Sequence, residues 1–137
     1  MASKGLMIAG LASGSGKTMV TLGLLRALAR RGKAPATGKT GPDYIDSGFL
    51  SAAAGRKAVN LDQFAMSKPL LAHLAADQTG ETLIIEGVMG LFDGASGNAG
   101  SSAALAEALD IPVILVMDVR HTAQTAAMIA AGVASLL

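Results

Sequence analysis

The sequence predicts an α/β fold in which a mainly parallel sheet lies between two layers of helices. Apolar runs typical of buried strands begin at Gly5, Thr82 and Val113, and a helical pattern follows each of them. Strands that alternate with helices pair in parallel, because each helical crossover returns the chain to the same end of the sheet. No internal repeat or linker is visible, so residues 1–137 are predicted to form a single domain.

The composition excludes several classes of protein. Hydrophobic residues make up 51% of the chain and charged residues 15%, with a net charge of +1, so we expect no nucleic-acid partner. No apolar run reaches the roughly 18 residues of a membrane helix, and no cleavage region precedes the first strand, so a cytoplasmic protein is expected. The absence of cysteine excludes disulfides, thiolate metal sites and a cysteine nucleophile within these residues.

The first strand leads into a loop whose composition is typical of phosphate binding. Small residues precede Gly16, Lys17 and Thr18, and a helical pattern follows. One apolar face of this helix is formed by Val20, Leu24, Leu25 and Leu28. In such loops backbone N–H groups surround phosphate oxygens, the lysine reaches the β- and γ-phosphates, and the threonine hydroxyl holds Mg²⁺. An ordinary glycine-rich turn is the alternative, since the common spacing wants glycine at Leu11 and this chain has Gly10 instead.

A short strand is expected at residues 34–38, and the segment 38–46 that follows has the composition of a loop. The loop contains a lysine, two carboxylates and the only tyrosine of the chain, namely Lys39, Asp43, Asp46 and Tyr44. Open α/β sheets bind ligands beyond the carboxyl ends of their strands, so we expect a ligand here. A solvated turn is the alternative.

Helices are predicted at residues 47–55 and 68–76, separated by a segment whose pattern is ambiguous. Ser47 is a candidate cap and Gly55 a candidate stop for the first helix, and Pro69 fits the first turn of the second. The second helix carries His73. A lone helical histidine is more often a packing residue than a functional one.

Two predicted strands end in a carboxylate. Glu86 ends the strand 82–86, and Asp118 follows the strand 113–117. Charge at the end of a buried strand is costly unless it is paired or metal-bound, so Glu86 is a candidate metal ligand, with a structural ion pair as the alternative. Asp118 falls on the same edge of the sheet, where capping the following turn is the alternative role.

The remaining segments complete a predicted sheet of four strands. A loop at 95–101 precedes a helix at 102–109, and an alanine-rich helix is expected at 122–137. Such a sheet leaves one edge bare, so we expect the sequence to be part of a larger domain or of a longer chain.

Four motifs stand in order along the chain: ASGSGKT at 12–18, GPDYID at 41–46, NLD at 60–62 and EGVMGLFDG at 86–94. Together they resemble the N-terminal synthetase domain of the cobyrinate a,c-diamide synthases, over essentially the whole chain. The phosphate loop alone is similar to a wider group that includes dethiobiotin synthetase. The resemblance implies a P-loop nucleoside triphosphate hydrolase fold, incomplete at the C-terminus, and an amide ligase that uses ATP and Mg²⁺.

The resemblance also implies roles for individual residues. The nucleotide would be held by the loop residues Ser13, Gly14, Ser15, Gly16, Lys17, Thr18 and Met19. Thr18 and Glu86 would ligate Mg²⁺, with Asp43 as a third candidate. Lys39 would face the phosphates or the substrate carboxylate. Asp43 and Asp46 would line the substrate side, and Asp93 would lie near the transferring phosphoryl group.

In the implied reaction, ATP phosphorylates the a and c carboxylates of a corrin, cobyrinate or hydrogenobyrinate, and ammonia then attacks. The ammonia comes from glutamine through a C-terminal glutaminase domain with a cysteine nucleophile. Residues 1–137 contain no cysteine, so that domain is absent from them and free ammonia is the donor expected of this chain alone. The resemblance leaves a homodimer open.

Two positions depart from the family pattern. Leu50 stands where the family usually has histidine, and His121 stands where it usually has glycine. Three other interpretations stay open. One is a partitioning-type P-loop ATPase switch, whose loop typically has an extra lysine near Leu11 or Ala12. The others are a small-molecule kinase and an inactive nucleotide-binding fragment.

Overall fold

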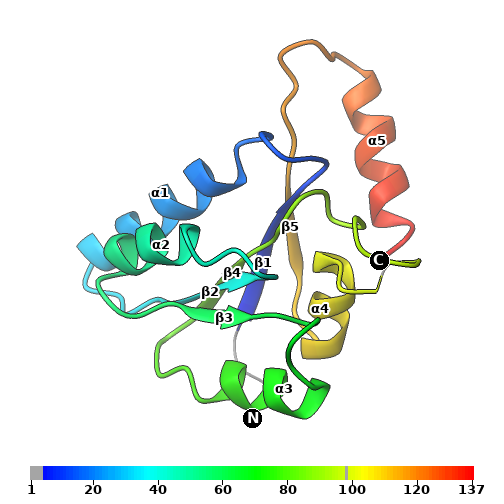
Figure 1. Cartoon of the computed structure of the whole chain (residues 1–137). Helices are drawn as coiled ribbons and strands as arrows, with labels where there is room; N and C mark the ends of the chain where they lie inside the picture. The colour runs from blue at the N-terminus through cyan, green and yellow to red at the C-terminus, as the bar shows by residue number, and fades with distance from the viewer. Residues whose placement is uncertain (1–4, 98) are drawn as a thin grey trace.

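The computed structural model describes residues 5–97 and 99–137 and contains a parallel sheet with helices on both faces (Figure 1). The strands are β1 (Gly5–Gly10), β2 (Ala36–Thr40), β3 (Val59–Leu61), β4 (Leu83–Glu86) and β5 (Val113–Val116). The helices are α1 (Lys17–Arg30), α2 (Asp46–Ala54), α3 (Lys68–Ala76), α4 (Ser102–Leu109) and α5 (Thr125–Ala134). The strand order is β3-β2-β4-β1-β5 and every pair is parallel, which confirms the predicted fold class.

Helices α1 and α2 cover one face of the sheet, and α3 and α4 cover the other (Figure 1). On the α1 face, Ile8 and Ile84 of the central strands pack with Leu25 and Leu50 of the helices. A larger apolar cluster fills the opposite face, between the sheet and α3 and α4. The central strands are therefore buried on both sides, as their continuous apolar runs predict.

The buried face of α1 differs at one position from the predicted face. Leu25 is fully buried and Leu24 and Leu28 are partly buried, as expected, whereas Val20 is 44% exposed. Thr21 takes the inner position instead and donates its hydroxyl to the Lys17 carbonyl oxygen at 2.8 Å. This internal hydrogen bond allows a polar side chain to be buried there.

The segment 38–46 begins as a strand, so its prediction as a loop throughout is wrong. Lys39 and Thr40 belong to β2, which pairs with β3 on one side and β4 on the other. Glycine, lysine and threonine give a weak strand signal, and pairing on both sides overrides it. The ambiguous segment between the predicted helices contains β3, so the sheet has five strands rather than the four predicted.

Helix α2 begins at Asp46, and Ile45 rather than Ser47 occupies its N-cap position. Ser47 lies inside the first turn, so its prediction as a cap is wrong. Gly55 ends the helix with φ of 72°, as predicted, because glycine adopts this left-handed conformation without steric cost. The predicted helices 68–76 and 102–109 match α3 and α4, each capped by a serine hydroxyl.

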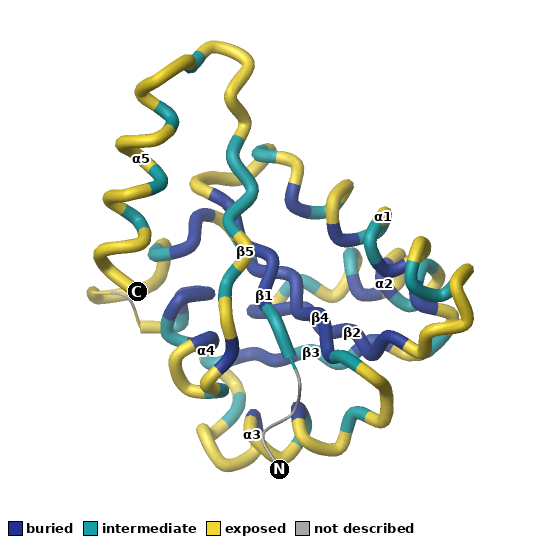
Figure 2. Tube along the Cα trace, turned by 180° about the vertical axis from the view of Figure 1, so that it is seen from behind, coloured by how far each residue is buried: buried dark blue, intermediate teal, exposed yellow. Residues whose placement is uncertain are grey.

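Helix α5 is shorter than the predicted 122–137 helix and stands apart from the sheet (Figure 1). None of its residues is buried, although Val133 packs against the core on the α4 face. Figure 2 shows α5 and the chain that leads to it as mainly exposed. Within the described residues, no helix has the length and apolar character needed to cross a membrane.

Candidate active site

The loop between β1 and α1 requires glycine at specific positions. Gly14 and Gly16 have φ of 77° and 93°, a region that side chains with a Cβ avoid. At Gly10 a Cβ would collide with the Ser15 hydroxyl oxygen and lie 3.0 Å from Cγ of Lys17. A side chain at position 10 would therefore force the Ser15 hydroxyl and the Lys17 stem to shift, because both pass over the end of β1.

Lys17 is only 7% exposed and its ammonium is folded onto the backbone. Nζ donates to the carbonyl oxygens of Ala12 at 2.9 Å and Met89 at 2.7 Å. Burial and repulsion from Lys39 lower the pKa of Lys17, against the attraction of Glu86 and Asp93. Both hydrogen-bonded partners are uncharged, so a phosphate at this position would supply an anionic partner that the ammonium lacks among the described residues.

Glu86 ends β4 fully buried and contacts the phosphate loop. Its Oε1 accepts a hydrogen bond from the Thr18 hydroxyl at 2.5 Å and one from the Lys39 ammonium at 3.1 Å. Its Oε2 is buried and has no hydrogen-bond partner in the described part of the chain. A buried carboxylate oxygen without a partner costs free energy unless a cation, a proton or water satisfies it.

The oxygens of Thr18 and Glu86 fit Mg²⁺, which prefers hard oxygen ligands. No cluster of three or more His, Cys, Asp or Glu side chains suited to a metal occurs within 5–97 and 99–137. Mg²⁺ commonly binds through one or two carboxylates and substrate phosphates while it keeps several waters. A hydroxyl and one carboxylate beside a phosphate loop are therefore a sufficient protein contribution.

Lys39 joins three carboxylates into one cluster. Its side chain is 3% exposed, and Nζ lies 3.1 Å from Asp46 Oδ2, 3.1 Å from Glu86 Oε1 and 3.4 Å from Asp43 Oδ2. Nζ also donates to the Gly87 carbonyl oxygen at 3.3 Å. Burial alone would lower the pKa of Lys39, but the Glu86 and Asp46 carboxylates outweigh it and raise the pKa. The charged ammonium thus links the 41–46 loop to the carboxylate beside Thr18.

Asp43 shapes the 41–46 loop from within. Its Oδ1 accepts hydrogen bonds from the backbone N–H groups of Ile45 and Asp46, both at 3.2 Å. Burial would raise the pKa of Asp43, but the Asp46 amide and Lys39 together lower it. Both carboxylate oxygens already have partners, and a role for Asp43 as a third metal ligand stays a prediction. Tyr44 and Ile45 are exposed, so apolar surface lies beside the carboxylates.

Asp93 lies in the loop after β4 and closes a turn there. Its Oδ2 accepts the Gly90 N–H at 2.8 Å, and a Cβ on Gly90 would lie 2.5 Å from the Leu11 carbonyl oxygen. Glycine at this position therefore lets the 87–94 loop pack against the phosphate loop. The negative charge of Asp93 acts to raise the pKa of Lys17, against the effect of burial, and a role for Asp93 near a phosphoryl group stays a prediction.

Asp118 caps the turn that follows β5, which is the alternative role that the sequence left open for it. Its Oδ1 accepts the Arg120 backbone N–H at 3.1 Å, and its Oδ2 lies 2.6 Å from the Arg120 guanidinium. Hydrogen bonds from the Arg120 side chain lower the pKa of Asp118 to about 2. This pair is exposed and is formed within one loop, so it does not join the cluster around Glu86.

Other predicted residues have simple positions. Ser13 and Met19 are exposed beside the loop, where their contribution to a nucleotide remains a prediction. Leu50 is fully buried in the core on the α1 face, which explains an apolar residue there. His73 lies in the last turn of α3, and His121 is exposed in the turn that follows Asp118.

Two groups that complete the site were not assigned a role from the sequence. The Met89 carbonyl oxygen receives Lys17, and Met89 has φ of 50°, which is uncommon for a residue with a side chain. Asn60 on β3 contacts the 41–46 loop. The available signal for Asn60 was its place in the NLD motif at 60–62, whereas a contact made by a backbone carbonyl cannot be read from a sequence.

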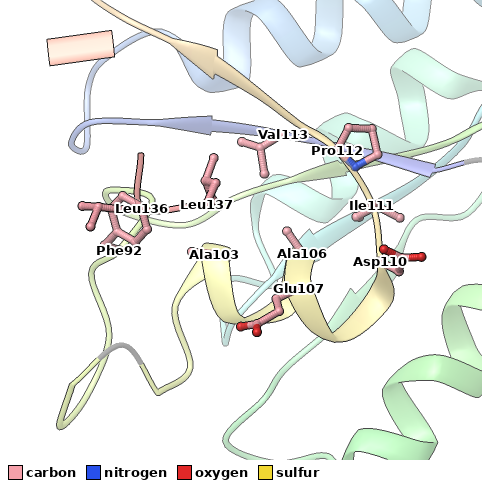
Figure 3. Close-up of a pocket in the computed structure, with 10 residues that line it drawn as sticks. All are labelled: Phe92, Ala103, Ala106, Glu107, Asp110, Ile111, Pro112, Val113, Leu136 and Leu137. Atoms are coloured by element: carbon pink, nitrogen blue, oxygen red, sulfur yellow. The ribbon is translucent and has the colours of Figure 1, made fainter. Parts of the chain in front are cut away.

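Cavities flank the phosphate loop on two sides. One of about 500 Å³ is lined by residues 14–16 and 117–120, and another of about 340 Å³ by residues 14, 16–19 and 22. A separate cavity of about 400 Å³ lies between α4, Phe92, the start of β5 and the end of the chain (Figure 3). Its lining includes none of the phosphate-loop residues or strand-end carboxylates, so it is not part of the candidate site.

Comparison with known proteins agrees with this geometry. The family model described as the CobQ/CobB/MinD/ParA nucleotide binding domain matches residues 6–135. The chain is 52% identical over 132 residues to a hydrogenobyrinate a,c-diamide synthase of Brucella anthropi, which covers 94% of this chain and 30% of that protein. It is 52% identical over 139 residues to the enzyme of that name from Agrobacterium fabrum, covering 98% of this chain and 32% of the relative.

A third relative, from Mesorhizobium japonicum and of the same name, is 50% identical over 140 residues, with 98% of this chain and 32% of the relative covered. The predicted resemblance to the a,c-diamide synthases is thereby confirmed. The chain spans about a third of the length of these curated relatives.

Proposed function

The chain belongs to the CobQ/CobB/MinD/ParA nucleotide binding domain family, and we propose that it is the synthetase part of an amide ligase dependent on ATP and Mg²⁺. The substrate would be a cobalamin-precursor corrin, cobyrinate or hydrogenobyrinate, whose a and c carboxylates become amides. The names of the relatives support this substrate class.

One observation carries the proposal: the buried carboxylate of Glu86 accepts the Thr18 hydroxyl at Oε1, and its Oε2 has no hydrogen-bond partner among the described residues. An oxygen in this state is suited to a divalent cation that also contacts phosphates. In the P-loop arrangement the lysine lies on the phosphate side of the metal. The charge of Glu86 acts to raise the pKa of Lys17, against the effect of burial.

The roles of the chain follow from the charges in the site. Bound ATP and Mg²⁺ would supply a γ-phosphoryl group with part of its charge neutralised. Lys17 would exchange its two carbonyl partners for phosphate oxygens and add positive charge where negative charge develops. The Lys39 ammonium lies among carboxylates that would face the substrate, and it would attract the substrate carboxylate toward the phosphate.

These residues would not generate the ammonia that the reaction consumes. The substrate carboxylate would attack the γ-phosphorus with loss of ADP, and ammonia would then displace phosphate from the acyl phosphate and lose a proton. Glutamine hydrolysis by a cysteine-dependent glutaminase would have to occur elsewhere, because the chain contains no cysteine. We propose free ammonia or a glutaminase domain as the source.

The partitioning type of P-loop ATPase remains the second candidate, because the family description includes such proteins. Two features favour the ligase. Position 12 is alanine and position 11 is leucine, so the extra loop lysine typical of the switch proteins is missing. The three relatives described above also carry ligase-type names.

The test is amidation of cobyrinate and hydrogenobyrinate in the presence of ATP, Mg²⁺ and ammonium, followed by mass spectrometry. We expect a mass decrease of about 1 Da per carboxylate converted to an amide, dependent on all three additions. A matched control contains a corrin whose a and c positions are already amides. ATP hydrolysis without any amide product would favour the switch ATPase, and absence of both would favour an inactive nucleotide-binding fragment.

A further inference from the structure

Asn60 makes two side-chain hydrogen bonds that connect β3 to the 41–46 loop. Its Nδ2 donates to the Asp43 carbonyl oxygen at 2.9 Å, and its Oδ1 accepts the Ser47 hydroxyl at 2.9 Å. The Ser47 hydroxyl also lies 3.3 Å from the same Asp43 carbonyl oxygen. The amide therefore bridges the loop and the first turn of α2.

The sheet register places this amide in the same row as the charged site. Asn60 is the register partner of Lys39, and Lys39 is the register partner of Glu86. Residues that are directly paired across parallel strands project to the same face. An amide, an ammonium and a carboxylate thus stand side by side at the carboxyl ends of β3, β2 and β4, under the loop that contains Asp43.

Asn60 and Lys39 hold different parts of the same loop. Lys39 attracts the carboxylates of Asp43 and Asp46, whereas Asn60 fixes the backbone at Asp43. The Asp43 side chain in turn accepts the N–H groups of Ile45 and Asp46. The position of one carbonyl oxygen therefore sets the position of both carboxylates relative to the phosphate loop.

The chemistry of the position requires an amide. The contacts call for one donor, toward a carbonyl oxygen, and one acceptor, toward a hydroxyl, on the same short side chain. Aspartate would keep the acceptor but place a second oxygen against the Asp43 carbonyl oxygen. It would also bring a fourth carboxylate to the Lys39 cluster.

We propose that Asn60 is a positioning residue that fixes the 41–46 loop so that the substrate carboxylate meets the phosphate end of the site. This role rests on the proposed function, since the loop is the substrate side of the amide ligase. Asn60 acts through Asp43 and Ser47, and its side chain makes no hydrogen bond to Lys17, Thr18 or Glu86 in the described part of the chain. Its loss should therefore weaken substrate binding and spare ATP binding.

The first measurement is hydrogen exchange at the backbone amides of Ile45 and Asp46 in the full chain. Asn60→Ala removes both hydrogen bonds, and Asn60→Asp is the isosteric variant that removes the donor. We expect exchange at the two amides to rise about tenfold or more in both variants. Gln78→Ala is the matched control, because it also removes an amide donor to a backbone carbonyl, at Leu74, outside the site.

The second measurement is ammonia-dependent amidation with each substrate varied in turn. We expect KM for the corrin to rise about tenfold while KM for ATP stays within about twofold of the wild type. Ser47→Ala removes the hydroxyl contacts to Asn60 and the Asp43 carbonyl oxygen but keeps the Asn60 donor to that oxygen, so it should give a smaller change in the same direction. It also serves as the test variant if Asn60→Ala does not fold.

Unchanged exchange at Ile45 and Asp46 would overturn the proposal, and so would an equal rise in both KM values, which would mean a general structural role. If the wild type amidates no corrin, the proposed function fails on its own. The exchange measurement then still decides whether Asn60 holds the loop.

Discussion

Two carboxylates follow parallel strands of this sheet, yet their surroundings differ completely. Glu86 ends the central strand β4, is fully buried, and receives Thr18 and Lys39 from two other elements. Asp118 follows the edge strand β5 and pairs with Arg120, two residues along the same exposed loop. Position at the end of a strand therefore does not make a site. A central strand with neighbours on both sides allows several elements to converge on one oxygen.

The two carboxylates also differ in whether both of their oxygens already have hydrogen-bond partners. Both Asp118 oxygens accept hydrogen bonds from the Arg120 side chain, which holds the pKa of Asp118 at about 2. Glu86 keeps one buried oxygen without a partner in the described residues. Only the second arrangement leaves a place for a cation, so the two carboxylates can be separated by experiment.

The largest expected effect is on catalysis. Glu86→Gln should reduce Mg²⁺-dependent ATP hydrolysis by on the order of 100-fold or more, because the neutral amide removes the charge that would hold the metal. Asp118→Asn is the comparison variant and should have a much smaller effect, because its carboxylate is paired with Arg120 within one exposed loop. Steady-state ATP hydrolysis measures the activity of both variants, and urea unfolding checks that both are folded. Unchanged hydrolysis in Glu86→Gln would remove Glu86 from the metal site.

The next effect is on stability. Lys39→Met should lower the free energy of unfolding by about 3–5 kcal/mol, because it leaves buried carboxylate charge without its partner. The double variant with Glu86→Gln should recover part of the loss, since the unpaired charge is then gone. Arg120→Met, at the exposed pair, should leave the urea midpoint unchanged. Equal midpoints for Lys39→Met and the wild type would show that the cluster does not stabilise the fold.

The smallest effect is on pH dependence. The pKa of Asp43 lies below its ordinary 3.8 in the folded chain, so its stabilisation is complete above the unfolded pKa and is lost as pH falls through the folded pKa. The difference in unfolding free energy between wild type and Asp43→Asn should thus be constant at neutral pH and shrink in acid below about pH 4. Urea unfolding from pH 7 downward measures it.

The salt dependence of stability also distinguishes the buried cluster from the exposed Asp118 pair. Asp43 is partly buried beside Lys39, so its contribution should persist in 0.5–1 M NaCl, roughly the range in which surface pairs are screened. The corresponding difference for Asp118→Asn should disappear under those conditions, because that pair is exposed. A salt-independent contribution from Asp118 would contradict the contrast between the two carboxylates.

Strong local patterns explain which parts of the fold could be predicted. Long apolar runs and Gly16-Lys17-Thr18 indicated the central strands and the phosphate loop, because their signals depend on neighbouring residues alone. Strand β3 and the end of β2 were missed, since Lys39 enters a strand through pairing with two neighbours. Val20 is exposed although it lies on the predicted apolar face. Helical periodicity predicts the apolar face of a helix, but it does not predict which side of that face packs against the sheet.

By itself the sequence determined the fold class, the phosphate loop and the chemical types available at the sheet edge, because these depend on local composition and spacing. Only the tertiary structure decided which groups meet. It joined Lys39 to three carboxylates and left one oxygen of Glu86 without a partner among residues 5–97 and 99–137. It also paired Asp118 within its own loop and brought Asn60 under Asp43. The physical reason is strand order: β2, β4 and β1 are neighbours in the sheet although they are far apart in the chain.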